Sequence, residues 1–227
     1  MTVDQLDAVR QFDTCAISNA IEQFGVRLRN EGFTSPGLQC VTGGSPRVIG
    51  YAATCRIRTS EPPMAGNRYM DRTDWWSAIK QLPKPRIAVI QDLDSRHGAG
   101  SSVGEVHAAI LKAFGCAAVI TNGTVRDVSD VGQMDFPMFA RSAAVSHSYT
   151  HIVDFCKPVT VFDLEIQSGD LIYVDIHGVV TIPHEIADDV AKVAARNHAQ
   201  ERLIIEACQD PHFSESRLLE LIHRKDD

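Results

Sequence analysis

The fold is decided by residues 86–127, which read RIAVIQDLDSRHGAGSSVGEVHAAILKAFGCAAVITNGTVRD. RIAVIQDL has the unbroken apolar pattern of a buried strand, and CAAVIT repeats it further on. Between them the pattern predicts a helix through Val106, Ile110 and Phe114, which Gly115 ends. Strand, helix and strand therefore follow one another in the middle of the chain.

The segments on either side complete this prediction. A strand is expected over residues 47–59, after a loop over 28–46, and more strands are expected in PMFARS, PVTVFDLEI, LIYVDI and GVVTI. Further helices are expected from the Thr2 cap, from Asp13 or Thr14, around Trp75 and Trp76, and as a pair after Pro183. This order predicts an α/β protein, a single-domain layered sandwich with a mixed central sheet flanked by helices.

The composition is that of one globular domain over residues 1–227. Apolar residues make up 44% of the chain and charged residues 22%, which excludes disordered and fibrous classes. The net charge of -7 argues against a nucleic-acid surface, and no apolar run approaches the roughly 18 residues of a membrane span. The N-terminus lacks the apolar core of a signal peptide and the six cysteines are scattered, so we expect reduced thiols and a cytoplasmic protein.

Three charged residues carry the strongest indication of chemistry. Glu105 opens the predicted helix, and after twenty intervening residues the pair Arg126-Asp127 follows the next strand and an Asn122-Gly123 turn. This turn would bring the pair back over the end of the sheet, close to Glu105. A carboxylate suits a magnesium ion and a guanidinium suits an oxyanion, so together they could stabilise the enolate of a 2-oxo acid. The alternative is structural, with Asp127 as a helix N-cap and Glu105 favouring the helix dipole.

The glycine- and serine-rich loop at residues 97–104 precedes the same helix. Backbone N–H groups that converge at a helix N-terminus suit a small anion such as a carboxylate or phosphate. The glycines also approximate a dinucleotide or methyl-donor fingerprint, but that fingerprint needs an acid near the end of the next strand. Thr121 and Asn122 stand there, so the small-anion interpretation is preferred.

The histidines and tryptophans favour structural roles. His147 and His151 are four residues apart in SHSYTH, without the apolar pattern of a zinc-binding helix, so a loop or surface position is expected. His107 projects from the predicted helix in a supporting or surface role, and His177 lies in a turn. Trp75 and Trp76 are expected in the core or at an interface.

Four stretches together resemble the RraA-like family, which includes the 4-hydroxy-4-methyl-2-oxoglutarate / 4-carboxy-4-hydroxy-2-oxoadipate aldolases. They are VIGYAAT, VGEVHAAILKAFGCAAVITNGTVRD, FPMFARS and SGDLIYVDIHGVVTIP, within about Asp13 to Glu201. The resemblance implies a swivelling β/β/α fold and a class II, metal-dependent pyruvate aldolase. Such a lyase cleaves a 4-hydroxy-2-oxo acid to pyruvate and a second carbonyl compound, with oxaloacetate decarboxylation as a side activity.

The resemblance also implies roles for particular residues. Asp127 would hold Mg²⁺ (or Mn²⁺) directly, and Arg126 would contact the 2-oxo acid and its enolate. Glu105 and Glu201 would support the metal through water, Glu201 from a neighbouring subunit of a homotrimer or homohexamer. The substrate carboxylate would meet the N–H groups of Gly104, Glu105, Val106 and His107.

Two features depart from the family pattern. Glu105 stands where characterised aldolases carry Asp, and an insert around residues 61–85, from about Asn67 to Pro85, contains the paired tryptophans. A helical segment over 184–227 completes the chain. Two alternatives to the lyase are a non-catalytic regulator that binds a ribonuclease and a methyltransferase; the missing ribose-binding acid argues against the second.

Overall fold

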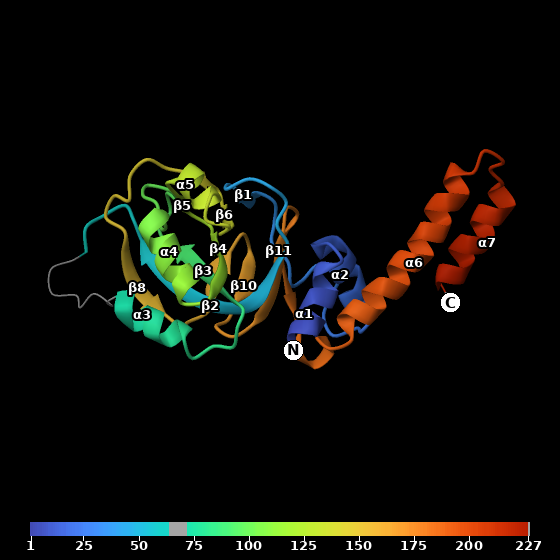
Figure 1. Cartoon of the computed structure of the whole chain (residues 1–227), viewed down its shortest axis with the longest axis horizontal. Coiled ribbons are helices and arrows are strands. Elements are labelled where there is room, and N and C mark those ends of the chain that lie inside the picture. The colour runs from blue at the N-terminus through green and yellow to red at the C-terminus, as the bar shows by residue number, and fades with distance from the viewer. Residues whose placement is uncertain (64–71, 227) are drawn as a thin grey trace.

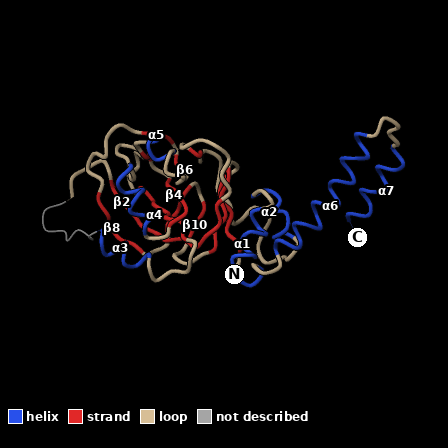
Figure 2. Tube along the Cα trace, in the orientation of Figure 1, coloured by secondary structure: helices blue, strands red, loops and turns tan. Residues whose placement is uncertain are grey.

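The structure, a computed structural model, describes residues 1–63 and 72–226. It consists of a body of strands and helices, from which a pair of helices extends as an arm (Figure 1). The same view coloured by secondary structure separates the strand-rich body from the all-helical arm (Figure 2). Within the described residues, no helix combines the length and the apolar character needed to cross a membrane.

The body is built on a mixed sheet, with the strand order β1-β6-β4-β3-β2-β11-β12 and with β8 also paired to β2. The pairs β2–β3, β3–β4 and β4–β6 are parallel, whereas β1–β6, β2–β8, β2–β11 and β11–β12 are antiparallel. The strands are β1 (Gln39–Cys40), β2 (Val48–Arg58), β3 (Arg86–Asp92), β4 (Cys116–Thr121), β6 (Met138–Ala140), β8 (His151–Phe155), β11 (Leu171–Asp175) and β12 (Gly178–Ile182). The mixed central sheet expected from the sequence is confirmed.

Two small strand pairs lie outside this sheet. They are β5 (Thr124–Val125) with β7 (Ser142–Ala143), and β9 (Val159–Val161) with β10 (Leu164–Ile166). The helices are α1 (Val3–Arg10), α2 (Thr14–Glu22), α3 (Arg72–Ile79), α4 (Glu105–Ala113), α5 (Val128–Gly132), the 3-10 helix η1 (His184–Ile186), α6 (Val190–Gln209) and α7 (Glu215–Asp226).

The sheet is covered on both faces, because its central strands are apolar on both sides. Along β3, Ala88 and Ile90 pack with α3 and α4, whereas Ile87 and Val89 pack with the β9–β10 hairpin. This alternation follows from the period of two in a strand. A third cluster joins α1, α2 and α6 to β11 and β12. The layers are thus helix, sheet and hairpin, in agreement with the expected β/β/α type.

Most predicted elements are confirmed, and their caps explain where they begin. Thr2 accepts from the Gln5 N–H while the Gln5 side chain accepts from the Thr2 N–H, which is the expected capping box. Asp13 caps α2 through the N–H of Ala16. The two helices expected after Pro183 are α6 and α7, which pack against each other.

Three predictions need correction. PVTVFDLEI is a hairpin rather than one strand, because Phe162 and Asp163 both adopt positive φ, 46° and 63°, and turn the chain. The loop expected over 28–46 contains β1, and SHSYTH ends on His151, the first residue of β8. The insert lies partly outside the described residues, Asn67 included. Its described helix α3 buries Trp75 and Ile79 in the core, as expected for Trp75.

Candidate functional site

A pocket of about 1040 Å³ opens on the face of the sheet that carries α4. Its lining brings together the end of the Gly/Ser loop, the starts of α4 and α5, part of α3, and the loop that leads into β8. It includes every site residue expected from the sequence except Glu201, namely Gly104, Glu105, Val106, His107, Arg126 and Asp127.

Asp127 links the two charged segments of the pocket. Its Oδ2 accepts the backbone N–H of Glu105 at 3.0 Å and lies 3.4 Å from Nε of Arg126. Both charged side chains are 36% exposed, so they face the pocket without being fully solvated. The convergence predicted for Arg126, Asp127 and the start of the helix at Glu105 is therefore observed.

The backbone of Asp127 is unusual for a non-glycine residue. Its φ of 53° is left-handed, and although it occupies the N-cap position of α5, its side chain makes no cap bond to that helix. The carboxylate reaches instead to the first residue of α4. Asp127 thus occupies the expected N-cap position, but the expected side-chain cap bond to its own helix is not observed. Strained backbone of this kind is concentrated at functional sites.

Gly104 leaves the space in which this contact forms. A Cβ atom at position 104 would overlap Oδ2 of Asp127 and lie 2.9 Å from Nε of Arg126. We expect Gly104→Ala to displace both side chains and to lower kcat at least tenfold, because small misplacements of catalytic groups are costly. Steady-state kinetics check this, with circular dichroism to verify folding. Wild-type kcat in a folded Gly104→Ala variant would show that the close approach is irrelevant.

The start of α4 is only partly open to a ligand. The N–H of Glu105 is donated to Asp127, so this group, expected to receive a substrate carboxylate, is already paired. The side chain of Val106 is 74% exposed, and the Glu105 side chain is exposed as well. Binding of a substrate carboxylate by the remaining N–H groups of this turn stays a prediction.

The carboxylates present suit a magnesium-like ion better than zinc. Asp127 and Glu105 line the pocket together with Asp130. Across residues 1–63 and 72–226, however, no three His, Cys, Asp or Glu side chains form a cluster able to bind a metal. Structural zinc needs four such side chains, whereas Mg²⁺ keeps several waters and uses one or two carboxylates. These oxygen donors are of the type that Mg²⁺ or Mn²⁺ prefers, and Asp127 would be the main protein ligand of such an ion.

A buried polar network precedes the Gly/Ser loop and holds it through Asp92, whose Oδ2 accepts the N–H of Gly98 at 3.3 Å. Oδ2 of Asp94 accepts the N–H groups of Thr59 at 2.6 Å and Ser60 at 2.8 Å, and Oδ1 accepts from Arg58 at 3.0 Å. Asp92 joins the network through the Thr59 hydroxyl. Burial alone would raise the pKa of Asp94, but these donors outweigh it and lower the pKa to about 2.

Asp94→Asn should therefore destabilise the protein at neutral pH. An unfolded Asp titrates near pH 3.9, so the bonded carboxylate contributes about 2 kcal/mol above that pH and loses this contribution as the pH falls through about 2. Urea unfolding at pH 7 and at pH 3 should show a difference between wild type and variant that shrinks at the lower pH. A difference that does not change with pH would contradict this role.

His107 is buried beneath the pocket rather than on the surface. Its Nδ1 lies 3.4 Å from the carbonyl oxygen of Ser102, and Nε1 of Trp76 donates to its Nε2 at 3.4 Å. Nδ1 must then carry the proton. Burial, helped by Arg72, lowers the pKa of His107 to about 4, so the ring is neutral at physiological pH. His107 thus connects α3 to the Gly/Ser loop, and the surface alternative is wrong.

His147 and His151 line the pocket, a position that the sequence did not reveal. His147 is on the exposed loop that was expected, but His151 begins β8. The only feature of the sequence that could have indicated this position is the polar cluster SHSYTH, and its spacing does not tell which segments lie next to it in the fold.

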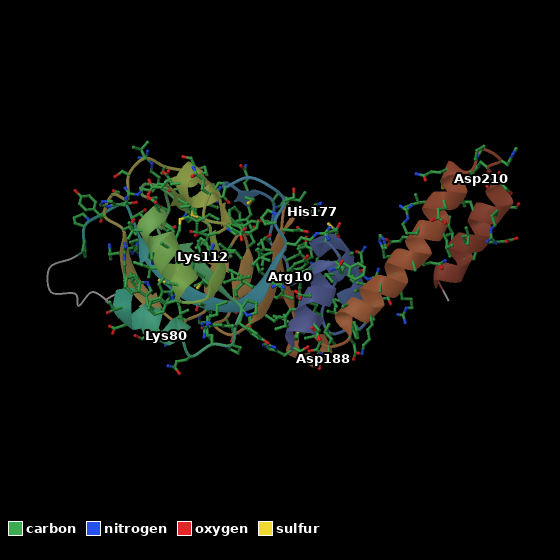
Figure 3. The ribbon with its side chains drawn as sticks, viewed as in Figure 1. Arg10, Lys80, Lys112, His177, Asp188 and Asp210 are labelled. Carbon is green, nitrogen blue, oxygen red and sulfur yellow. The ribbon has the colours of Figure 1, made fainter. Side chains whose placement is uncertain are left out.

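Two other expected residues lie away from the pocket. His177 is in the β11–β12 turn, on the side of the body near α2, where its Nδ1 is 3.2 Å from Asp175 (Figure 3). Glu201 is on α6, in the arm that extends away from the body (Figure 1). A role for Glu201 therefore requires a second copy of the chain and stays a prediction.

Comparisons with known proteins agree with this fold. The family model described as RraA-like, Aldolase/RraA, matches residues 14–181. A relative from Halalkalibacterium halodurans, by its name a candidate 4-hydroxy-4-methyl-2-oxoglutarate aldolase, is 28% identical over 108 residues, which cover 47% of this chain and 51% of the relative. The match thus spans about half the length of that relative.

Two solved structures are similar over nearly the whole chain. An uncharacterized protein from Pseudomonas syringae has a TM-score of 0.74 and 24% identity, with 97% of this chain and 95% of that chain covered. A Streptomyces coelicolor protein, described as an unusual member of the RNase ES inhibitor RraA family, has a TM-score of 0.70 and 17% identity, with 89% and 96% covered. Because the family model covers well over half of its length, this chain belongs to the RraA-like family.

Proposed function

We propose that this chain is a divalent-metal-dependent lyase that cleaves the C3–C4 bond of a 4-hydroxy-2-oxo acid to pyruvate and a second carbonyl compound. The observation that carries the proposal is the contact of Asp127 with both the start of α4 and Arg126 inside one pocket. This contact places a metal-binding carboxylate beside an oxyanion-binding guanidinium. Membership of a family that includes aldolases supports the same reaction class.

The charges in the pocket match the charges that the reaction develops. When the 4-hydroxyl loses its proton and the C3–C4 bond breaks, the bonding electrons pass to C3 and spread to the 2-oxo oxygen as an enolate. Protonation of C3 then gives pyruvate. In this proposal Arg126, which lines the pocket, binds the enolate oxygen, and such preorganised donors are typically a large part of enzymatic rate enhancement.

We assign to Glu105 the role of the base that accepts the proton of the 4-hydroxyl. Its side chain is exposed in the pocket, one residue from Gly104 and close to Asp127 through its own N–H. Mg²⁺ or Mn²⁺, when bound at Asp127, supplies Lewis-acid polarisation of the 2-oxo group. The described lining contains no lysine, so no Schiff base is assigned.

Oxaloacetate decarboxylation provides the simplest test, because it needs the same enolate but no base. Protein treated with EDTA should release pyruvate at a background rate, and Mg²⁺ or Mn²⁺ should restore the activity by a factor of at least about 10². A coupled lactate dehydrogenase assay measures this, with the enzyme-free metal rate as the control. Full activity after chelation would refute metal dependence, and no activity with metal would favour a ribonuclease-binding regulator instead.

We also propose that the site is completed in a homotrimer or homohexamer, to which a neighbouring subunit contributes Glu201. The arm supports this, since it exposes apolar side chains on both of its helices, among them Leu203 and Ile205 on α6 and Leu219 on α7. Apolar surface of this kind is unusual on a monomer. Light scattering should give the mass of three or six chains; a monomeric mass with full activity would exclude the shared site.

A further inference from the structure

The pocket has more room than the pyruvate-forming half of a substrate needs. Its volume of about 1040 Å³ is slightly above the roughly 300–1,000 Å³ of typical ligand pockets. Arg126 and Asp127 line this pocket together with residues 147–151, which lead into and begin β8. For a substrate bound at Arg126, we place the carbon chain beyond C4 in the space bordered by these residues.

The loop at residues 146–151 is fixed against the Gly/Ser loop before any ligand binds. The N–H of Ser101 donates to the carbonyl oxygen of Ser146 at 2.8 Å, and the hydroxyl of Thr150 donates to the carbonyl oxygen of Ser101 at 2.9 Å. The two backbones approach so closely that a Cβ atom at Gly100 would lie 2.5 Å from the carbonyl oxygen of His147. This wall is therefore preformed, which reduces the entropic cost of binding.

Ser101 contributes an unsatisfied hydroxyl to this wall. The residue lines the pocket and is 2% exposed, and its Oγ has no hydrogen-bond partner among the described residues. Buried polar atoms are rarely left unpaired, so the Oγ of a serine that lines a cavity is a candidate partner for a ligand in that cavity. A serine hydroxyl can turn among its staggered positions and both donate and accept.

His147 contributes an acceptor to the same wall. Its Nδ1 is 2.8 Å from the carbonyl oxygen of Ser148, which can only accept, so Nδ1 carries a proton. In the tautomer with its proton on Nδ1, Nε2 is left as an acceptor. Ser148 adopts a φ of 47°, a left-handed conformation that shapes the loop at this point.

We propose that Ser101 and His147 bind hydroxyl groups on the tail of the substrate, which makes the substrates 4-hydroxy-2-oxo acids with a hydroxylated chain beyond C4, the class of deoxy sugar acids. This inference rests on the proposed lyase function. A hydroxyl donates to Nε2 of His147 and pairs with Oγ of Ser101, whereas a carboxylate cannot donate and an alkyl group leaves Ser101 unpaired. Arg72 also lines the pocket and would favour an acidic tail, which is the competing outcome.

The experiment compares three substrates that differ only in their tails, by pyruvate release from the metal-loaded enzyme. They are 4-hydroxy-2-oxopentanoate with a methyl tail, 4-hydroxy-2-oxoglutarate with a carboxylate tail, and a 3-deoxyhex-2-ulosonate with a dihydroxylated tail. We expect kcat/KM to be at least about tenfold higher for the hydroxylated acid than for the other two, since sites built around substrate hydroxyls discriminate strongly. Ser101→Ala and His147→Ala should each lower the ratio of hydroxylated to methyl substrate about five- to tenfold.

Ser142→Ala is the matched control, because Ser142 is exposed on β7 outside the pocket, and it should keep the wild-type ratio. His147 lies on an exposed loop, so His147→Ala should fold normally. It therefore tests the inference even if Ser101→Ala fails to fold. Equal use of the three tails, a preference for the carboxylate tail, or unchanged ratios in both variants would overturn this inference alone. No pyruvate from any substrate or from oxaloacetate would overturn the proposed function and the inference with it.

Discussion

Asp127→Ala should lower kcat for pyruvate release by at least about 10²–10³, the usual cost of losing one well-placed electrostatic group. The carboxylate is the only side chain to which we assign direct metal binding, and it also positions the first turn of α4 through the N–H of Glu105. The loss should therefore appear in kcat for both oxaloacetate and the aldol substrate. Steady-state kinetics at saturating Mg²⁺ measure it.

The design must separate lost chemistry from lost backbone conformation. Asp127 has a φ of 53°, which asparagine tolerates better than alanine, so Asp127→Asn should remain folded and still be inactive. Asp135 is the matched control, since it is exposed and has a φ of 50°. Asp135→Ala should keep wild-type kcat. Near-normal activity in Asp127→Asn would contradict the assignment of Asp127 to the metal.

Arg126→Ala should have the second-largest effect, a fall in kcat of about 10² or more, because the enolate oxygen would lose its charged donor. Arg126→Lys should recover only part of the activity, since lysine offers a point charge in place of a planar, forked donor. Arg29→Ala is the control, because Arg29 is an arginine with an 85% exposed side chain outside the pocket. Equal kcat values for Arg126→Ala and wild type would remove the arginine from the mechanism.

Much of the fold could be predicted because local and global preferences agree. The β3–α4–β4 unit follows from apolar runs and from Gly115, and the capping residues Thr2 and Asp13 act where the sequence places them. The convergence of Glu105 with Arg126-Asp127 was also predictable. The carboxyl end of β4 and the start of α4 lie at the same edge of the sheet. Only a short turn separates β4 from the Arg126-Asp127 pair, so the pair must stay close to that edge.

The remainder depends on tertiary contacts that spacing does not encode. Asp127 has the sequence position of an N-cap, yet its left-handed backbone turns the carboxylate toward α4. The sequence allowed a supporting or a surface role for His107, and the surface role is excluded because Trp76 of α3 packs over the ring. The pocket wall at His147 exists because the loop before β8 meets the Gly/Ser loop, and β8 pairs with a strand about a hundred residues away in sequence.

Titration calorimetry with Mn²⁺ would decide between the lyase and a protein that merely shares its fold. If the carboxylate of Asp127 holds the metal beside Arg126, wild-type protein should bind about one Mn²⁺ per chain and Asp127→Asn should lose this binding, while Asp135→Ala retains it. If Asp127→Asn binds Mn²⁺ as tightly as wild type, the metal is elsewhere and the lyase mechanism assigned to this pocket is wrong.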